Sequence, residues 1–379
     1  MANEMTRRDF SWHLRMSPRS GPVGLADLPL HNGRAPAWLF GRMVKLAREV
    51  LAHVVAEYGP GEVLDRLSDP YWFQAFGCAL GFDRPSAVRG LEGDFGFHVA
   101  GGKGAASRRT PAEIERACEA LGHDAALLVR ASRLSAKVDN TALQDGYQLY
   151  HHVLLFTRDG RWCVVQQGMS DASRSARRYH WLGDRVTSFV EEPHAAICCD
   201  ARAETFNMVA GESGPARAAT SEVAGRQPEK TLAELTARDL DPARLRRTLL
   251  RTYEGAPADF ESLLGIEGVG PKTLRALALV AELIYGARAS TRDPACFAFA
   301  HGGKDGTPFP VDRAIYDQTI EVLRCAVRRA KVDRSDRVRA LKRLAGFAAR
   351  VPDAPGALPL PGRGPGPIQG SLPLEVPGV

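Results

Sequence analysis

The chain has 379 residues, 44% of them hydrophobic, which is enough to bury a sizeable core and to form about two or three domains. Its 50 Lys and Arg residues exceed its 44 Asp and Glu residues, and the net charge of +6 favours a polyanionic partner where positive charge is clustered. Seven cysteines without a C-x-x-C pair argue against a zinc ribbon or a redox dithiol, and no apolar run reaches the roughly 18 residues of a membrane span. We therefore expect a cytoplasmic protein with no membrane partner.

The N-terminal part of the sequence predicts helices. Residues 1–20 are polar and mixed in charge, and we expect them to form a loose leader outside the folded part. An amphipathic period then predicts a helix over 37–57, which Gly59 and Pro60 end, and a second helix over 61–67.

The centre of the sequence predicts a β-hairpin. Two runs rich in β-formers, 147–157 and 161–168, flank Asp159-Gly160, a dipeptide that favours a type I′ turn. Side chains alternate between the faces of a strand. The first strand is therefore expected to place Gln148, Tyr150 and His152 on one face and Leu149, His151 and Val153 on the other.

Polar segments around this hairpin predict a catalytic centre. Metal-dependent cleavage of a phosphodiester uses converging carboxylate or histidine ligands on a divalent cation. We expect Mg or Mn to be held by Asp139, Asp145 and Glu192. The candidate catalytic residues are Lys137, Asp139, Asp145, His152, Gln167, His180, Glu192 and His194. No spacing requires them to converge, and each is alternatively a cap, turn or surface residue.

Two further segments carry positive charge. Arg177 and Arg178 precede Tyr179 and Trp181, a mixture of cations and aromatics that clamps the backbone and stacks bases in single-stranded grooves. The equally weighted alternative is that the aromatic residues belong to the core and the arginines to the solvent. The segment AGGKG (100–104) predicts a phosphate cradle or, alternatively, a surface turn.

The C-terminal part is predicted to be helical and to bind DNA. A connector over 201–240 leads to the segment GVGPKT, which lies between two apolar stretches and resembles a helix-hairpin-helix motif. Its glycines allow a tight turn whose amides face a phosphate, at the N-terminus of the second helix. The DNA-binding residues are expected to be Gly268, Val269, Gly270, Lys272 and Thr273. An ordinary αα-hairpin is the alternative.

A second interpretation is that the same region is the active site of an enzyme. Helix-hairpin-helix glycosylases resemble this arrangement, with a lysine where Lys272 stands and a later Val-Asp at a helix start, here Val311-Asp312. The resemblance implies that Lys272 attacks the sugar as an amine and that Asp312 stabilises the developing cation. The long connection between them departs from the glycosylases, and Lys272 is alternatively a phosphate contact and Asp312 a helix N-cap.

The last residues, 349–379, are rich in proline and glycine and are expected to form a disordered tail. The tail contains QGSLPL, which resembles the peptide that binds the bacterial sliding clamp through Gln369, Leu372 and Leu374. Gly370 departs from the hydrophobic residue usual at that position. Such a peptide raises the local concentration of an enzyme at clamp-encircled DNA.

Many separate segments occur in an order that resembles the domain of unknown function 763 family. Among them are GLADLPLHNGRAPAWLFGRMVKLA, SAKVDNTALQDGYQLYHH, VVQQGM, ARRYHW, EEPHAAIC, GVGPKT and PVDR. The resemblance runs from about residue 24 to residue 344, and it implies DNA processing without assigning a catalytic residue.

We therefore expect an α+β protein with a small antiparallel sheet. The expected units are a leader (1–20), a mixed catalytic domain (21–200), a connector (201–240), a helical DNA-binding domain (241–348) and the tail (349–379). The leading hypothesis is a metal-dependent DNA nuclease for processing or repair. The alternatives are a glycosylase or abasic-site lyase, and a DNA-binding adaptor recruited to the sliding clamp.

Overall fold

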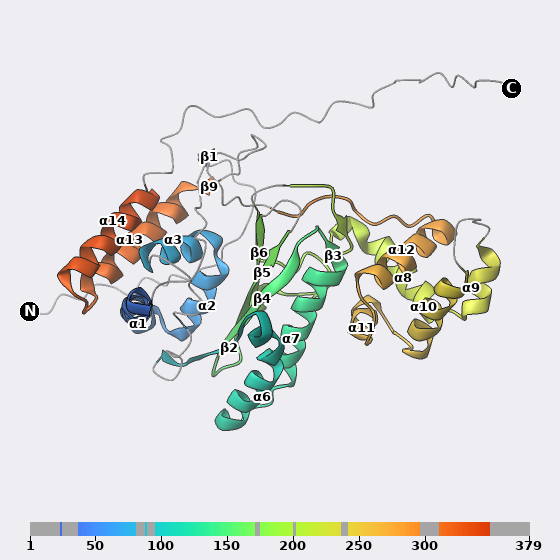
Figure 1. The fold of residues 1–379 in the computed structure, drawn as a ribbon, viewed down its shortest axis with the longest axis horizontal. Coiled ribbons are helices and arrows are strands. Elements are labelled where there is room, and N and C mark those ends of the chain that lie inside the picture. The colour runs from blue at the N-terminus through green and yellow to red at the C-terminus, as the bar shows by residue number, and fades with distance from the viewer. Residues whose placement is uncertain are drawn as a thin grey trace, which may run out of the picture.

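A computed structural model describes residues 23–24, 37–80, 88, 95–170, 175–199, 202–235, 242–295 and 311–348. It confirms the α+β class, with helices on both faces of a small antiparallel sheet (Figure 1). In the described part of the chain, no helix has the length and apolar character needed to cross a membrane.

The central sheet has five antiparallel strands in the order β2-β4-β5-β6-β7. Their bounds are β2 (Phe97–Lys103), β4 (Gln148–Thr157), β5 (Trp162–Met169), β6 (Ala176–Leu182) and β7 (Ala196–Cys199). Two short pairs lie outside it, β1 (Val23–Gly24) with β9 (Val311–Asp312), and β3 (Leu143–Gln144) with β8 (Phe206–Asn207).

The predicted hairpin forms between β4 and β5, but its turn is not of type I′. Gly160 has a positive φ of 85°, whereas Asp159 does not, and a type I′ turn needs positive φ at both central residues. The Gly160 amide donates to the Thr157 carbonyl at 3.0 Å, and the Thr157 amide donates to the Arg161 carbonyl. The loop therefore spans three residues and needs only one glycine.

The predicted alternation along β4 fails at its start because the register with β5 shifts between Leu149 and His151. Leu149 packs against the same core as Leu154, whereas Val153 belongs to the core on the opposite face. A bulge adds one residue to a strand and reverses the faces of the residues before it. The sequence alternation therefore holds only from His151 onward.

The first face of the sheet is covered by helices from both ends of the chain, and we call it the α1 face. These helices are α1 (Ala37–Tyr58), α2 (Pro60–Ser68), α3 (Pro70–Leu80), α13 (Arg313–Arg329) and α14 (Arg334–Ala348). Their core includes Leu51, Trp72, Phe76, Leu323 and Leu344 and reaches the sheet at Val153 and Leu155. The helices expected over 37–57 and 61–67 are confirmed as α1 and α2.

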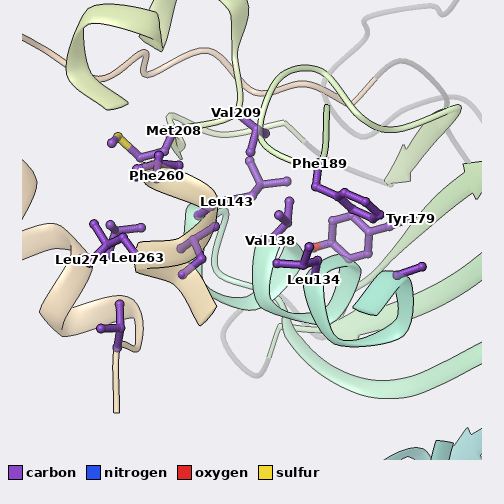
Figure 2. Close-up of a cluster of buried hydrophobic side chains, with 14 of the residues drawn as sticks. Leu134, Val138, Leu143, Tyr179, Phe189, Met208, Val209, Phe260, Leu263 and Leu274 are labelled. Carbon is purple, nitrogen blue, oxygen red and sulfur yellow. The ribbon is translucent and has the colours of Figure 1, made fainter. Parts of the chain in front are cut away.

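The second face is covered by α6 and α7, the remaining helices pack beyond them in the same core, and we call this side the α7 face. The helices of this side are α6 (Thr110–Leu121), α7 (Ala126–Lys137), α8 (Gly214–Gly225), α9 (Pro228–Glu234), α10 (Pro242–Glu254), α11 (Phe260–Gly265) and α12 (Pro271–Tyr285). A π-helical turn, η2 (Val138–Ala142), continues α7. Figure 2 shows side chains of α7, η2, β6, α11 and α12 meeting in one apolar cluster, with Tyr179 beside Phe189 and Leu263 beside Leu274.

The helices expected to form one unit over 241–348 divide between the two cores. Helices α10–α12 pack on the α7 face, whereas α13 and α14 pack against α1 and α3 (Figure 1). Helix α8, which lies in the expected connector, buries Ala216 and Val223 and packs closely on α12. The apolar faces of α13 and α14 pack against the N-terminal helices, which lie far from them in sequence.

The glycine segment AGGKG belongs to β2 and its end. Gly101 has φ 97°, and a Cβ there would lie 2.3 Å from the His152 carbonyl oxygen. The Gly101 amide donates to the Glu113 carboxylate at 2.8 Å. This amide therefore binds a carboxylate of the chain itself, and the glycine permits the close approach of β4.

Candidate functional site

Asp139 lies at the centre of a buried polar cluster on the α7 face. Its side chain projects from η2, is fully buried, and accepts three hydrogen bonds. Gln166 Nε2 and Trp181 Nε1 donate to Oδ2 at 2.5 and 2.9 Å, and His194 Nε2 donates to Oδ1 at 2.5 Å. Three donors satisfy a carboxylate that would otherwise be very costly to bury.

His194 forms the outer edge of this cluster. The Asp139 carboxylate can only accept, so His194 Nε2 carries the proton of this hydrogen bond. Nδ1 is the other ring nitrogen of His194. Within the described residues Nδ1 has no hydrogen-bond partner, and it lies at the accessible edge of a side chain that is 7% exposed. The Trp181 ring packs edge-on against the imidazole at 4.6 Å between centroids. Asp139 and His194 together form an oriented dyad with one open nitrogen.

A hydrogen-bonded chain leads inward from Asp139 to helix α7. Gln166 uses its amide nitrogen for Asp139, and its Oε1 accepts from His152 Nδ1 at 2.9 Å. His152 Nε2 then accepts from the Ser132 hydroxyl at 2.9 Å. Burial lowers the pKa of His152, so the imidazole is neutral and its tautomer is set by Gln166.

A second buried carboxylate, Asp145, lies beside the first. Its Oδ2 accepts from Arg177 Nη1 at 2.9 Å and from the Tyr179 hydroxyl at 2.7 Å. Arg177 also donates to Asp293 at 2.6 Å and lies over the Tyr147 ring. Burial raises the pKa of Asp145, while Arg177 and Tyr179 act in the lowering direction. Burial also raises the pKa of Tyr179, so its hydroxyl keeps its proton and donates.

The three predicted metal ligands have separate partners. Asp139 and Asp145 are enclosed by the donors just described, whereas Glu192 is exposed and accepts from Arg292 at 3.2 Å. Among the described residues, no group of three or more His, Cys, Asp or Glu side chains is arranged to hold a metal ion. The structure brings two of the carboxylates near each other and leaves Glu192 in a surface loop.

Other predicted site residues lie outside the Asp139 cluster. Gln167 is half-buried and has the strand parity of Val165, which belongs to the α1 face. His180 Nδ1 contacts the Leu67 carbonyl oxygen at 3.1 Å, on that same face. Arg177 and Arg178 are buried in β6, which has strands on both sides and helices on both faces. They therefore do not form the surface clamp that the sequence suggested.

Sequence reasoning missed several members of the cluster. The sequence prediction includes Gln167 but not its neighbour Gln166, and the strand alternation distinguishes the two only once the buried face is known. The sequence predicts Trp181 and Tyr179 as stacking or core residues, whereas in the structure each donates to a buried carboxylate. Ser132 and Asp293 lie in segments without any sequence signal, so only the tertiary structure could place them.

The α11–α12 hairpin forms where GVGPKT predicted it. Gly268 has φ 80°, which favours glycine, and Val269 is fully buried as a plug. Helix α12 begins at Pro271 with no side-chain cap, and its first backbone bond within the helix runs from the Leu274 amide to the Gly270 carbonyl. The amides of Lys272 and Thr273 precede that bond, so they are among the donors that a helix N-terminus leaves open.

The hairpin is docked onto the same segment that carries Asp139. Lys137 Nζ donates to the Val269 carbonyl at 2.8 Å, and burial lowers the pKa of Lys137. Gln144 Nε2 donates to the Pro271 carbonyl at 2.9 Å, and Gln144 Oε1 accepts from Arg275. The segment 137–145 therefore has two roles. Lys137 and Gln144 bind the hairpin turn, and Asp139 and Asp145 are the buried carboxylates.

Positive charge gathers beside the turn. The guanidinium of Arg251, on α10, lies close to Gly268. A Cβ on that glycine would be 2.8 Å from Arg251 Nη1. Arg244, Arg247 and Arg251 are spaced along one side of α10, and all three are exposed. In the described part of the chain, Arg251, Lys272 and Arg275 form no ion pair with a carboxylate.

The two residues of the glycosylase or lyase alternative are not brought together. Lys272 is exposed on α12, whereas Asp312 lies in β9, beside α13 and on the other side of the sheet (Figure 1). The side chain of Asp312 and the tail residues Gln369, Leu372 and Leu374 lie outside the described part of the structure.

Comparison with known proteins places the chain in a family. The model of the family described as "Protein of unknown function (DUF763)" matches residues 24–311, so the chain belongs to this family. No match was found among curated proteins or among solved structures.

Proposed function

We propose that this member of the DUF763 family is a DNA-processing protein that holds the sugar-phosphate backbone through the turn of the α11–α12 hairpin. The observation that carries the proposal is the open N-terminus of α12, which is flanked by cations that have no carboxylate partner among the described residues. Backbone contacts of this kind fix the position of DNA without reading its sequence.

The geometry of the turn supports phosphate binding in two ways. The open amides of Lys272 and Thr273 lie at the positive end of a 15-residue helix dipole. Gly268 and Gly270 carry no side chains that would cover those amides, and buried Val269 anchors the turn to the core. A phosphate oxygen can therefore approach the backbone closely.

The charge around the turn supports a polyanionic ligand. Arg251, Lys272 and Arg275 bring three positive charges, and the nearest acidic residue in the sequence, Glu267, is exposed and forms no ion pair within the described residues. Phosphate contacts by such cations release condensed counterions from DNA. Binding is therefore expected to weaken steeply as salt increases.

The docking of the hairpin supports a role in processing rather than binding alone. Lys137 and Gln144 tie the turn to the segment that carries Asp139 and Asp145. DNA held at the turn would thus be positioned relative to a polar cluster that contains an oriented histidine. An adaptor function predicts the same binding without any change to the DNA.

The test is fluorescence anisotropy of labelled single-stranded, duplex and forked DNA over a series of salt concentrations. Lys272→Ala and Arg251→Ala are expected to weaken binding and each to reduce the salt slope by about one. Glu267→Gln is expected to tighten binding, because it removes a negative charge beside the turn.

Lys342→Ala is the matched control, since Lys342 is an exposed lysine on α14 at the α1 face. Its removal is expected to leave both affinity and salt slope nearly unchanged. Equal losses for Lys342→Ala and Lys272→Ala would mean that binding reflects net charge alone, and the hairpin proposal would then be wrong.

A further inference from the structure

His194 differs from the two other histidines of the predicted site. His152 is enclosed and uses both ring nitrogens in hydrogen bonds, and His180 is fully buried. Among the described residues, His194 uses only Nε2, toward Asp139, and its Nδ1 lies at the accessible edge of the side chain. An imidazole oriented by a buried carboxylate, with its other nitrogen open, is the arrangement that general-base catalysis needs.

The backbone holds His194 in place from both sides. The Glu192 amide donates to the Val209 carbonyl at 2.8 Å, and the Ala195 amide donates to the His180 carbonyl at 2.8 Å. Glu192 has a positive φ of 42°, an unfavourable conformation for a residue with a side chain. Strain of this kind clusters at functional sites, where the surrounding structure enforces it. The backbone is therefore fixed on both sides of His194.

Two arginines pair with the carboxylates of the His194 loop, and one of them, Arg292, also contacts Glu212 at 3.8 Å. Arg217 pairs with Glu191 at 2.9 Å, and Arg292 pairs with Glu192 at 3.2 Å. These pairs reduce the repulsion that two exposed carboxylates would otherwise exert on a phosphate. The paired arginines therefore leave less negative charge beside the ring than unpaired carboxylates would.

The His194 loop and the DNA-holding hairpin share one core. Phe189, from the same loop, belongs to the apolar cluster of the α7 face that also contains Leu263 and Leu274, which lie across the cluster from it (Figure 2). Asp139 itself is only two residues from Lys137, which holds the hairpin turn. The hairpin and the His194 loop are therefore anchored in one continuous core.

We propose that His194 is the catalytic base of phosphodiester hydrolysis and that Asp139 is its positioning residue, an inference that rests on the proposed DNA-processing function. The oxygen of a water molecule forms a bond to phosphorus while its proton moves to His194 Nδ1. The bond from phosphorus to the leaving sugar oxygen breaks, and that oxygen keeps the electron pair and takes a proton from solvent. The imidazolium then returns its proton to solvent, so one water is consumed for each bond cleaved.

The experiment incubates the full chain with end-labelled single-stranded, duplex and forked DNA, in Mg²⁺, Mn²⁺ or chelator, and follows cleavage on denaturing gels. His194→Ala is expected to lower the cleavage rate about 10²- to 10⁴-fold, the usual contribution of a general base. Asp139→Asn is expected to lower it less, because it leaves the imidazole in place but poorly oriented.

Three further measurements separate catalysis from structure. Imidazole added to the buffer is expected to restore part of the activity of His194→Ala, which a purely structural histidine would not allow. His123→Ala, at an exposed histidine after α6, is expected to cleave like the wild type. DNA affinity by anisotropy is expected to be unchanged in His194→Ala.

The outcomes distinguish this inference from the proposed function. Wild-type protein that binds DNA but cleaves none of the substrates overturns the role of His194 and leaves backbone binding intact. Cleavage that persists in His194→Ala, or a loss that imidazole does not restore, also overturns it. A wild type that does not bind DNA overturns the proposed function first, and the inference with it.

Discussion

The two faces of the sheet differ in what they bury, although the same strands form both. The α1 face packs large apolar side chains such as Trp72 and Phe76 from helices at both ends of the chain. The α7 face encloses the carboxylates of Asp139 and Asp145 within an apolar surround. Buried ion pairs seldom stabilise a fold more than apolar residues of similar size would. Under the proposed function the buried carboxylates of the α7 face serve the site, whereas the α1 face is mainly apolar, although it also encloses Arg178 and His180.

The largest expected effect tests the α1 face. Phe76 is fully buried and stacks on Trp72 at 4.8 Å between ring centroids. Phe76→Ala is expected to lower the free energy of unfolding by about 3–5 kcal/mol because it leaves a cavity. Urea denaturation measures this loss, and DNA affinity at low temperature is expected to stay unchanged. A parallel loss of DNA affinity in folded protein would contradict the division of roles.

A loss of similar size but different origin is expected on the α7 face. Arg177→Met leaves the buried carboxylates of Asp145 and Asp293 without their cation, which is expected to cost about 3–5 kcal/mol of the free energy of unfolding. Adding Asp145→Asn is expected to recover part of that loss, because one unpaired buried charge disappears. A double variant less stable than Arg177→Met would show that charge pairing is not the cause.

A smaller effect is expected where the hairpin meets the α7 face. Lys137→Met keeps the aliphatic stem but removes the hydrogen bond from Nζ to the Val269 carbonyl, at a cost of about 1–3 kcal/mol in the free energy of unfolding. DNA affinity is expected to fall as well, since the turn loses its tie to residues 137–145. Lys331→Met, at an exposed lysine beyond α13, is the control. Unchanged DNA affinity would mean that the turn keeps its shape without Lys137.

The smallest expected effect depends on pH. Burial lowers the pKa of His152 below its ordinary 6.5, so the unfolded chain takes up a proton more readily than the folded protein as the pH falls. The stabilising contribution of the neutral ring is thus present above the unfolded pKa and declines below it. Urea denaturation at about pH 7.5 and about pH 5 is expected to show a larger loss for wild type than for His152→Gln. Equal losses would place the pH dependence elsewhere.

Local patterns in the sequence predicted much of the fold. The apolar period predicted α1 and α2, and β-forming runs around Asp159-Gly160 predicted the β4–β5 hairpin. The segment GVGPKT predicted the α11–α12 turn. Each of these patterns involves only neighbouring residues in the chain, so each predicts its element without knowledge of the rest of the fold. The type of the hairpin turn and the bulge in β4 could not be read in this way.

The candidate site could not be predicted from local sequence patterns. The sequence named Asp139 and His194 together with six other candidate catalytic residues, and nothing in their spacing distinguished the dyad. Asp139 and His194 come together only because the chain passes through β6 into the loop that carries His194. Gln166, Trp181 and Ser132 joined the cluster only because strand register and helix packing brought them there.

The sequence by itself determined the α+β class, the positions of the main local elements and the resemblance to the DUF763 family, because periodicity, turn chemistry and ordered motifs are local properties. Only the tertiary structure decided that α13 and α14 join α1–α3, that Arg177 and Arg178 are buried, and that Lys137 docks the hairpin. Those outcomes depend on contacts between residues distant in sequence, where burial and charge pairing select the partners. The open nitrogen of His194, on which the proposed chemistry depends, is an outcome of the same kind.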